Sequence, residues 1–122
     1  MQEFREAIER RDLEAVGALF TDDVVFRSPV VHAPYTGRDQ VKALLYAVSQ
    51  VFEDFRYERE IGGPDAADHA LVFRARIGDR EVEGCDFLHV DDDGRIDEMF
   101  VMIRPMSGLT ALAEGMKRQL GL

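Results

Sequence analysis

The sequence predicts an α+β domain in which a curved, mostly antiparallel sheet wraps around helices. Apolar residues recur with a helical period from Val41 to Phe55, which indicates one long amphipathic helix. Residues 71–77 alternate with a period of two, and turn sequences such as Gly78-Asp79 separate the later strands. Strands joined by hairpins form an antiparallel sheet, and the amphipathic helix must then cover one face of it.

The N-terminal part is expected to hold two short helices and a strand. Apolar residues recur at helical spacing over residues 4–8, and a second helix follows Asp12, which stands at an N-cap position. Residues 24–26 are rich in β-formers, and Pro29 restricts the residue before it to an extended conformation, so the strand ends there. Residues 30–37 contain a proline and a glycine and predict an ordered loop.

The long amphipathic helix is expected over residues 38–53. Four strands should follow it, one from Arg56 to a turn at 62–65 and the others over residues 71–77, 81–90 and 96–104. A sheet of this length twists, and it would curl around the helix. A closing helix is expected after Pro105, with Ser107 at its N-cap position.

Composition and charge limit the class of protein. The chain has 122 residues, 46% hydrophobic and 32% charged, which suits one globular domain over residues 1–122. A formal net charge of -9 repels phosphate backbones and anionic lipid, so neither a nucleic acid nor a membrane is expected as a partner. The single cysteine, Cys85, permits no intrachain disulfide, which fits a cytoplasmic protein.

Asp86 is the first candidate for chemistry. The even positions of the strand over residues 81–90 form its more apolar face, and Asp86 lies in the middle of that face. A carboxyl group that faces an apolar interior has a raised pKa, so it can serve as an acid or as a neutral hydrogen-bond donor near neutral pH. The alternative is that Asp86 pairs with a buried arginine or caps a backbone group, and the pattern favours neither.

His32 and Tyr35 are the second candidates, because loops at the mouth of a scaffold often supply site residues. The alternative is a surface loop with incidental polar side chains. His89 lies on the polar face of its strand and is expected at an outer face or a subunit contact. His69 follows an acidic turn and is expected to be exposed.

Neither a metal nor a cofactor is expected. The three histidines lack the close spacing of a metal site, and the acidic residues 91–94 are explained by a hairpin turn. Glycine-rich nucleotide loops and a nucleophile elbow are absent. Cys85 has no basic neighbour in sequence and is expected to be a packed thiol.

The last strand is apolar on both faces and predicts a homodimer through the sheet. Met99, Val101 and Ile103 share one face, while Phe100 and Met102 share the other. One face can line the interior, and the second then needs cover from the closing helix or from another subunit.

Two segments resemble the nuclear transport factor 2-like superfamily, over essentially the whole chain. One segment runs through residues 12–24 and continues, after Pro29, with residues 35–38 at the start of the long helix; the other covers residues 86–96. The resemblance implies a cystatin-like, cone-shaped α+β barrel with a pocket. Because this fold hosts many unrelated functions, it does not by itself imply an activity.

Within the superfamily, residues 86–96 look like those of ketosteroid isomerases, in which an aspartic acid at the place of Asp86 donates a hydrogen bond to a dienolate oxygen. The chain departs from that family at two positions. Ser28 stands where the family has its general base, and Phe4 stands where it has its oxyanion tyrosine. The resemblance therefore does not imply steroid isomerisation by that mechanism.

The SnoaL-like branch is most similar, and its polyketide cyclases use an acid/base aspartate with a histidine nearby. Limonene epoxide hydrolase, another relative, needs an Asp-Arg-Asp arrangement, whereas the sequence offers one pocket aspartate. The side chains expected to bind the ligand on this fold are Phe4, Phe26, Ser28, Leu45, Phe52, Phe73, Leu88, Met99 and Val101.

Two functions follow as hypotheses. In the first, a small apolar molecule enters the pocket, Asp86 acts as general acid or base, and His32 or Tyr35 polarises a carbonyl or holds a water. The reaction would be a cofactor-independent isomerisation, cyclisation or hydrolysis. In the second, the protein is a non-catalytic ligand-binding or dimeric structural domain, which the replaced base and tyrosine favour.

Overall fold

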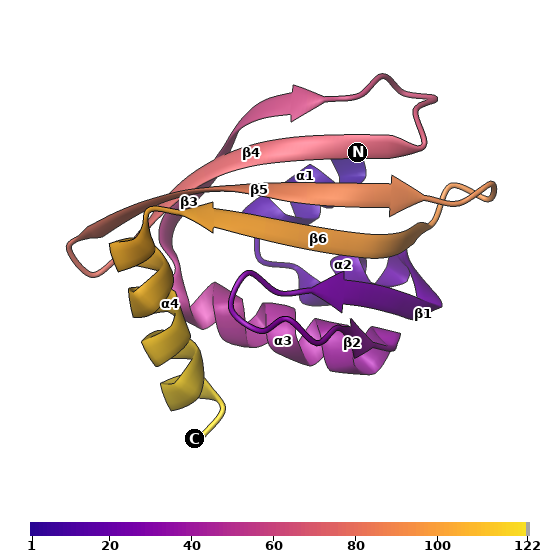
Figure 1. Ribbon diagram of the computed structural model, residues 1–122. Helices are drawn as coiled ribbons and strands as arrows, with labels where there is room; N and C mark the ends of the chain where they lie inside the picture. The colour runs from indigo at the N-terminus through magenta and orange to yellow at the C-terminus, as the bar shows by residue number, and fades with distance from the viewer. Residues whose placement is uncertain (122) are drawn as a thin grey trace.

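A curved, unclosed sheet of six strands covers the helices α1 to α3 (Figure 1). The computed structural model describes residues 1–121. The strands are β1 (Phe20–Arg27), β2 (Tyr35–Thr36), β3 (Glu53–Ile61), β4 (Asp68–Ile77), β5 (Arg80–Val90) and β6 (Ile96–Arg104). The helices are α1 (Gln2–Glu9), α2 (Leu13–Ala18), α3 (Arg38–Val51) and α4 (Met106–Gln119).

The strand order is β2-β1-β6-β5-β4-β3. Neighbouring strands are antiparallel except for β1 and β6, which pair in parallel. The predicted α+β class and mostly antiparallel sheet are therefore confirmed. Every helix within residues 1–121 is too short or too polar to span a lipid bilayer.

The two N-terminal helices form as the sequence predicts. Asp12 caps α2, because its Oδ1 accepts a hydrogen bond of 3.1 Å from the backbone N–H of Ala15. Phe4 and Ala7 of α1 and Val16 of α2 turn toward the core and are buried. These contacts hold both helices against the concave side of the sheet.

Helix α3 ends two residues before the predicted boundary at Glu53. Phe52 adopts an extended conformation, with ψ of 138°, and Glu53 already pairs with Arg76 as the first residue of β3. Phe52 and Phe55 continue the helical spacing of apolar residues although they lie beyond the helix. The helical period predicts the boundary too late, because both residues face the core from an extended backbone and not from the helix.

Further boundaries differ from the prediction. Strand β1 begins at Phe20, four residues before the predicted start at residue 24, and β3 begins at Glu53, three residues before Arg56. Residues 35–36 form the short strand β2, which pairs with β1 instead of remaining loop. Strand β4 begins at Asp68, three residues earlier than expected, and thereby includes His69. Helix α4 begins at Met106, directly after Pro105, so Ser107 lies within the helix and is not its N-cap.

Helix α4 packs across one end of the sheet and against α3 (Figure 1). Close approach depends on glycine: a Cβ on Gly115 would stand 2.7 Å from Cγ1 of Val51 in α3. Between these contacts Leu112 is buried, with 2% of its surface exposed. The helix therefore closes this end of the space beneath the sheet.

Candidate functional site

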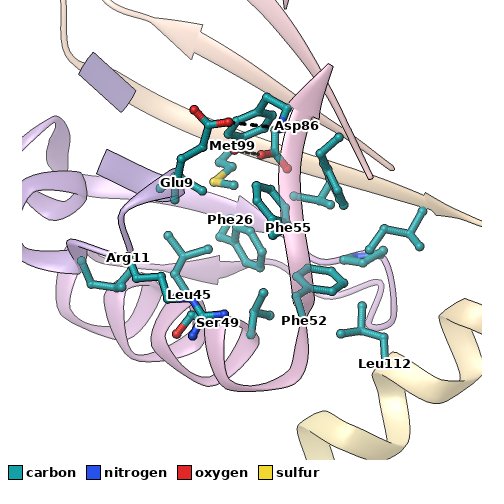
Figure 2. A pocket seen from close by; sticks show the side chains of 18 of the residues that line it. Glu9, Arg11, Phe26, Leu45, Ser49, Phe52, Phe55, Asp86, Met99 and Leu112 are labelled. Atoms are coloured by element: carbon teal, nitrogen blue, oxygen red, sulfur yellow. Dashed lines mark hydrogen bonds between the residues drawn. The ribbon is translucent and has the colours of Figure 1, made fainter. Parts of the chain in front are cut away.

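A cavity of about 320 Å³ lies between the concave face of the sheet and helices α3 and α4. Its wall is mostly apolar. Residues of the sheet and of all four helices contribute side chains to it (Figure 2). The volume is at the lower end of the range of about 300–1,000 Å³ for small-molecule sites. Within residues 1–121, no group of three or more histidine, cysteine, aspartate or glutamate side chains could hold a metal ion.

Asp86 lines this cavity from the middle of β5. Its backbone pairs with Leu71 of β4 and Val101 of β6, and the alternation of the strand turns its side chain to the concave face. Only 4% of the residue is exposed. The arginine partner considered as an alternative is not found there, since the carboxylate's partner is a tyrosine.

That partner is Tyr57 of β3, whose hydroxyl donates a hydrogen bond of 2.6 Å to Oδ2 of Asp86. Tyr57 is also 4% exposed. Among residues 1–121, the side-chain hydrogen bond that Asp86 makes is the one at Oδ2, and Oδ1 takes no part in it. The pair therefore leaves one carboxylate oxygen free for a molecule in the cavity.

Burial raises the pKa of Asp86 to about 7, and the hydrogen bond from Tyr57 opposes this rise. The pKa of Tyr57 lies well above its usual value of 10, first because of burial and then because of the charge of Asp86. Near neutral pH, both forms of the carboxyl group are thus populated, while the phenol keeps its proton. A group with these properties can accept a proton or donate one.

Two side chains of α1 fix the backbone of Tyr57. Nη2 of Arg5 donates to the carbonyl oxygen of Tyr57 at 3.3 Å, and Oε2 of Glu9 accepts from its N–H at 3.3 Å. Arg5 and Glu9 are themselves 3.5 Å apart. Because β3 is an edge strand, these contacts satisfy backbone groups that no neighbouring strand can reach.

An aromatic cluster of Phe52, Phe55, Tyr57 and Phe73 forms one side of the cavity. The ring centroids of Phe55 and Phe73 are 4.9 Å apart, and those of Phe55 and Tyr57 are 5.0 Å apart with the rings perpendicular. Such packing holds Tyr57 in place and keeps the surroundings of Asp86 apolar.

The residues predicted to bind a ligand divide into two groups. Those that line the cavity are Phe26, Leu45, Phe52, Phe73, Met99 and Val101. Phe4 and Leu88 do not line it, because they are buried in the core beside it. Ser28 is also outside the lining; its Oγ accepts hydrogen bonds from the N–H groups of Val30 and Val31 at 3.0 and 3.2 Å.

His32 and Tyr35, predicted to act with Asp86, are not brought to the cavity. His32 is exposed in the loop after β1. Tyr35 pairs with Phe26 as part of β2 at the edge of the sheet and packs against the outside of the core. The short β2 strand binds this loop to β1 and so keeps both side chains away from Asp86.

The other two histidines also lie outside the cavity lining. His69 was expected to be exposed, but it is 5% exposed, and its Nε2 lies 2.9 Å from the carbonyl oxygen of Ala66. The early start of β4 turns it inward with Leu71. Nδ1 of His89 lies 2.6 Å from Oδ1 of Asp97, which raises the pKa of the imidazole.

Tyr57 is the site residue that sequence reasoning missed. It is the one buried residue of β3, and its neighbours in sequence are charged. The available signal was the alternation of Phe55 and Tyr57 on one face of that strand. The cavity is also lined by Glu9, Arg11 and Asp54. Their neighbours in sequence are polar or charged, as on an ordinary surface, so the sequence does not indicate that they belong to a site.

A family model described as a SnoaL-like domain matches residues 1–99 of the chain. None of the curated proteins matches this chain significantly. Solved structures do match. A steroid delta-isomerase from Pseudomonas aeruginosa is 48% identical, with a TM-score of 0.93, over 98% of this chain and 88% of that one.

An uncharacterized protein with a cystatin-like fold from Silicibacter pomeroyi DSS-3 is 32% identical, with a TM-score of 0.93, over 98% of this chain and 84% of that one. SalBIII, an epoxide hydrolase/cyclase-like enzyme of pyran ring formation in salinomycin, is 20% identical, with a TM-score of 0.69 over 88% of each chain. At that identity the likeness to SalBIII shows the fold alone.

Proposed function

Because this chain belongs to the SnoaL-like family, whose model matches residues 1–99, we propose that it binds a small, largely apolar molecule and transfers a proton on it. Asp86 is the acid or base in this proposal, and Tyr57 holds it. The observation that carries the proposal is the position of Asp86: a carboxyl group with a pKa of about 7, hydrogen-bonded at Oδ2 by Tyr57 and placed in the wall of an apolar cavity.

The chemistry that suits this pair is proton transfer beside a carbonyl group. Ionised Asp86 takes a proton from the carbon next to the carbonyl, the electron pair moves to the carbonyl oxygen, and the carboxylic acid then returns the proton to the same or another carbon. A base with a pKa near the working pH serves both halves of such a reaction, and one such group contributes roughly 10² to 10⁴ in rate. Isomerisation and aldol-type cyclisation both contain this step.

The relative from Pseudomonas aeruginosa supports this reaction class because it is described as a steroid delta-isomerase. The positions that the resemblance to ketosteroid isomerases assigns to a base and a tyrosine are occupied here by Ser28 and Phe4, which do not line the cavity. Asp86 would therefore have to act as the base itself, with Tyr57 as its hydrogen-bond donor.

The test uses 2-tetralone, a small bicyclic ketone, in deuterated buffer, with the exchange of its α-protons followed by NMR. We expect the protein to accelerate exchange over buffer, and Asp86→Asn to reduce the acceleration by roughly 10² or more. Asp79→Asn, at a turn position with a 97% exposed side chain, is the matched control and should exchange as the wild type does. Unchanged exchange in Asp86→Asn would remove Asp86 from the reaction.

The second candidate is a binding protein without a reaction. It is favoured because Asp86 is the one buried carboxyl group of the cavity. Ser28 stands where ketosteroid isomerases have their general base, and its hydroxyl already accepts hydrogen bonds from the N–H groups of Val30 and Val31. In this case 2-tetralone binds to the cavity, as calorimetry would detect, but its protons exchange at the rate of the buffer.

We further propose that two copies associate through the outer face of the sheet. Phe87 and Phe100 pair across β5 and β6 with their ring centroids 6.1 Å apart, and Met102 beside them is 52% exposed. An apolar group of this kind favours burial against a second copy. A cytoplasmic setting stays a prediction from the single cysteine.

A further inference from the structure

We propose that Arg11 binds a carboxylate group of the ligand at the mouth of the cavity, so that the ligand is an apolar acid instead of a neutral molecule. This inference rests on the proposed function, since it needs an apolar molecule in the cavity. It adds the chemical class of that molecule and a residue that selects it.

The first observation is the pairing of charged groups in the cavity wall. Glu9 lies 3.5 Å from Arg5, Asp54 lies 2.7 Å from Nε of Arg76, and Asp86 holds Tyr57. Arg11 is the remaining charged residue of the wall, and no carboxylate within residues 1–121 is within ion-pair distance of it. The wall therefore has one guanidinium group whose donors are free for a ligand.

The second observation is the backbone of Arg11. Its φ is 59°, in the left-handed region, where it ends α1 by donating from its N–H to the carbonyl of Ile8 at 3.0 Å. Glycine is the residue that suits this position, because a side chain is strained there. The chain has an arginine at a backbone position where glycine would fold with less strain, which favours a role for the side chain.

Stabilisation of the end of α1 is the competing explanation, because a cation interacts favourably with the C-terminal end of a helix. Arg10, directly before Arg11, already provides a positive charge at this end as the C-cap residue, and it contacts Asp12 at 3.5 Å. Arg10 does not line the cavity. The two arginines are thus a natural pair for separating a structural effect from a ligand effect.

The third observation is the arrangement of the polar groups. Figure 2 shows Arg11 and Ser49 toward one side of the cavity and Asp86 toward the other, with Phe26 and Phe55 between them. A ligand that satisfies both ends has an apolar body, a carboxylate that the planar guanidinium can hold by two hydrogen bonds, and an oxygen at the opposite end for Asp86. Glu9 does not oppose this binding strongly, since Arg5 accompanies it.

The experiment compares 2-naphthylacetate with its neutral amide, 2-naphthylacetamide, by titration calorimetry. Both probes have the same apolar body, and at about pH 6 the first is ionised while Asp86 is mostly protonated. We expect the wild type to bind the acid roughly tenfold more tightly than the amide, which corresponds to about 1.4 kcal/mol.

Two variants remove the guanidinium, Arg11→Gln and Arg11→Gly, and the second relieves the backbone at φ of 59° and so keeps the fold. In both, the preference for the acid should disappear while the affinity for the amide stays within about twofold. Arg10→Gln, with the same loss of charge one residue away, should keep the preference.

The outcomes separate the two proposals. Equal binding of acid and amide by the wild type, or a preference that persists in Arg11→Gly, overturns the role of Arg11 and leaves the apolar cavity site intact. Failure of both probes to bind overturns the proposed function, and the inference about Arg11 with it.

Discussion

The hydroxyl of Tyr57 and the carboxylate of Asp86 form a hydrogen bond of 2.6 Å at a place where each residue is only 4% exposed. They lie 29 residues apart in the chain and on strands that are not neighbours, because β4 stands between β3 and β5. The curvature of the sheet lets the phenol reach across β4 on the concave side. Since neither group is solvated, the protonation of one depends on the other.

The first prediction concerns the pH dependence of stability. The pKa of Asp86 is raised from 3.8 to about 7, so between these pH values an unfolded chain ionises the carboxyl while the folded chain keeps its proton. The free energy of unfolding therefore falls as pH rises through this window, by roughly 4 kcal/mol in total, and the loss is complete above about pH 7.

Asp86→Asn does not titrate, so its free energy of unfolding relative to the wild type should rise from about pH 4 to pH 7 and then level off. Urea unfolding at a series of pH values measures this difference, with Asp79→Asn as the control that tracks the wild type. A difference that is flat across the window would contradict the burial of an ionisable Asp86.

The second prediction is that Tyr57→Phe raises the pKa of Asp86 above its wild-type value of about 7. The hydrogen bond from Tyr57 stabilises the ionised carboxylate and lowers its pKa, and phenylalanine removes this bond while it preserves the ring packing. Carbon-detected NMR of the aspartate carboxyl groups measures the shift. Tyr46→Phe, on the exposed side of α3, should leave it unchanged.

A lower pKa for Asp86 in Tyr57→Phe would mean that the phenol accepts, instead of donates, the hydrogen bond. In a working enzyme the same variant should move the pH profile of turnover in the alkaline direction, because Asp86 then ionises at higher pH.

The third prediction concerns the contact that closes the cavity. In Gly115→Ala the new methyl group would stand 2.7 Å from Cγ1 of Val51, so α4 must shift, and we expect a loss of about 1–3 kcal/mol in stability. Val51→Ala removes the methyl group that the new side chain would meet. The double variant should therefore lose less stability than the sum of the two single variants, and a double-mutant cycle measures this difference.

Gly63→Ala is the control for this cycle, because nothing lies within 4 Å of the added methyl group and stability should change little. If the effects of Gly115→Ala and Val51→Ala simply add, the two side chains do not determine how closely α4 approaches α3.

The fourth prediction concerns association. Phe100→Glu places a charge in the apolar group of Phe87, Phe100 and Met102 on the outer face of the sheet, and we expect it to convert a dimer to a monomer in sedimentation experiments. Tyr46→Glu, at a position that is 59% exposed on α3, should leave the dimer intact. A wild type that sediments as a monomer would contradict the proposed association.

Much of the fold could be predicted because local rules determine it. The alternation of residues 96–104 reproduces β6, and Asp12 caps α2 as its position indicates. The predicted boundary of α3 was wrong because Phe52 faces the core at the helical spacing although its backbone is extended. Because loops often supply site residues, the sequence predicts His32 and Tyr35 at the pocket, but the pairing of β2 with β1 holds them outside its lining.

The class of fold and the inward direction of Asp86 can be derived from the amino-acid order, since both follow from periods of a few residues along one strand or helix. What Asp86 contacts inside depends on how the chain folds in three dimensions. Its partner Tyr57, the α1 side chains that hold Tyr57, and the placement of Arg11 at the same cavity depend on the order and curvature of strands from distant parts of the chain. The alternation of residues along a strand predicts which face of the sheet a side chain lies on. The distance between side chains of two non-adjacent strands depends on the curvature of the folded sheet.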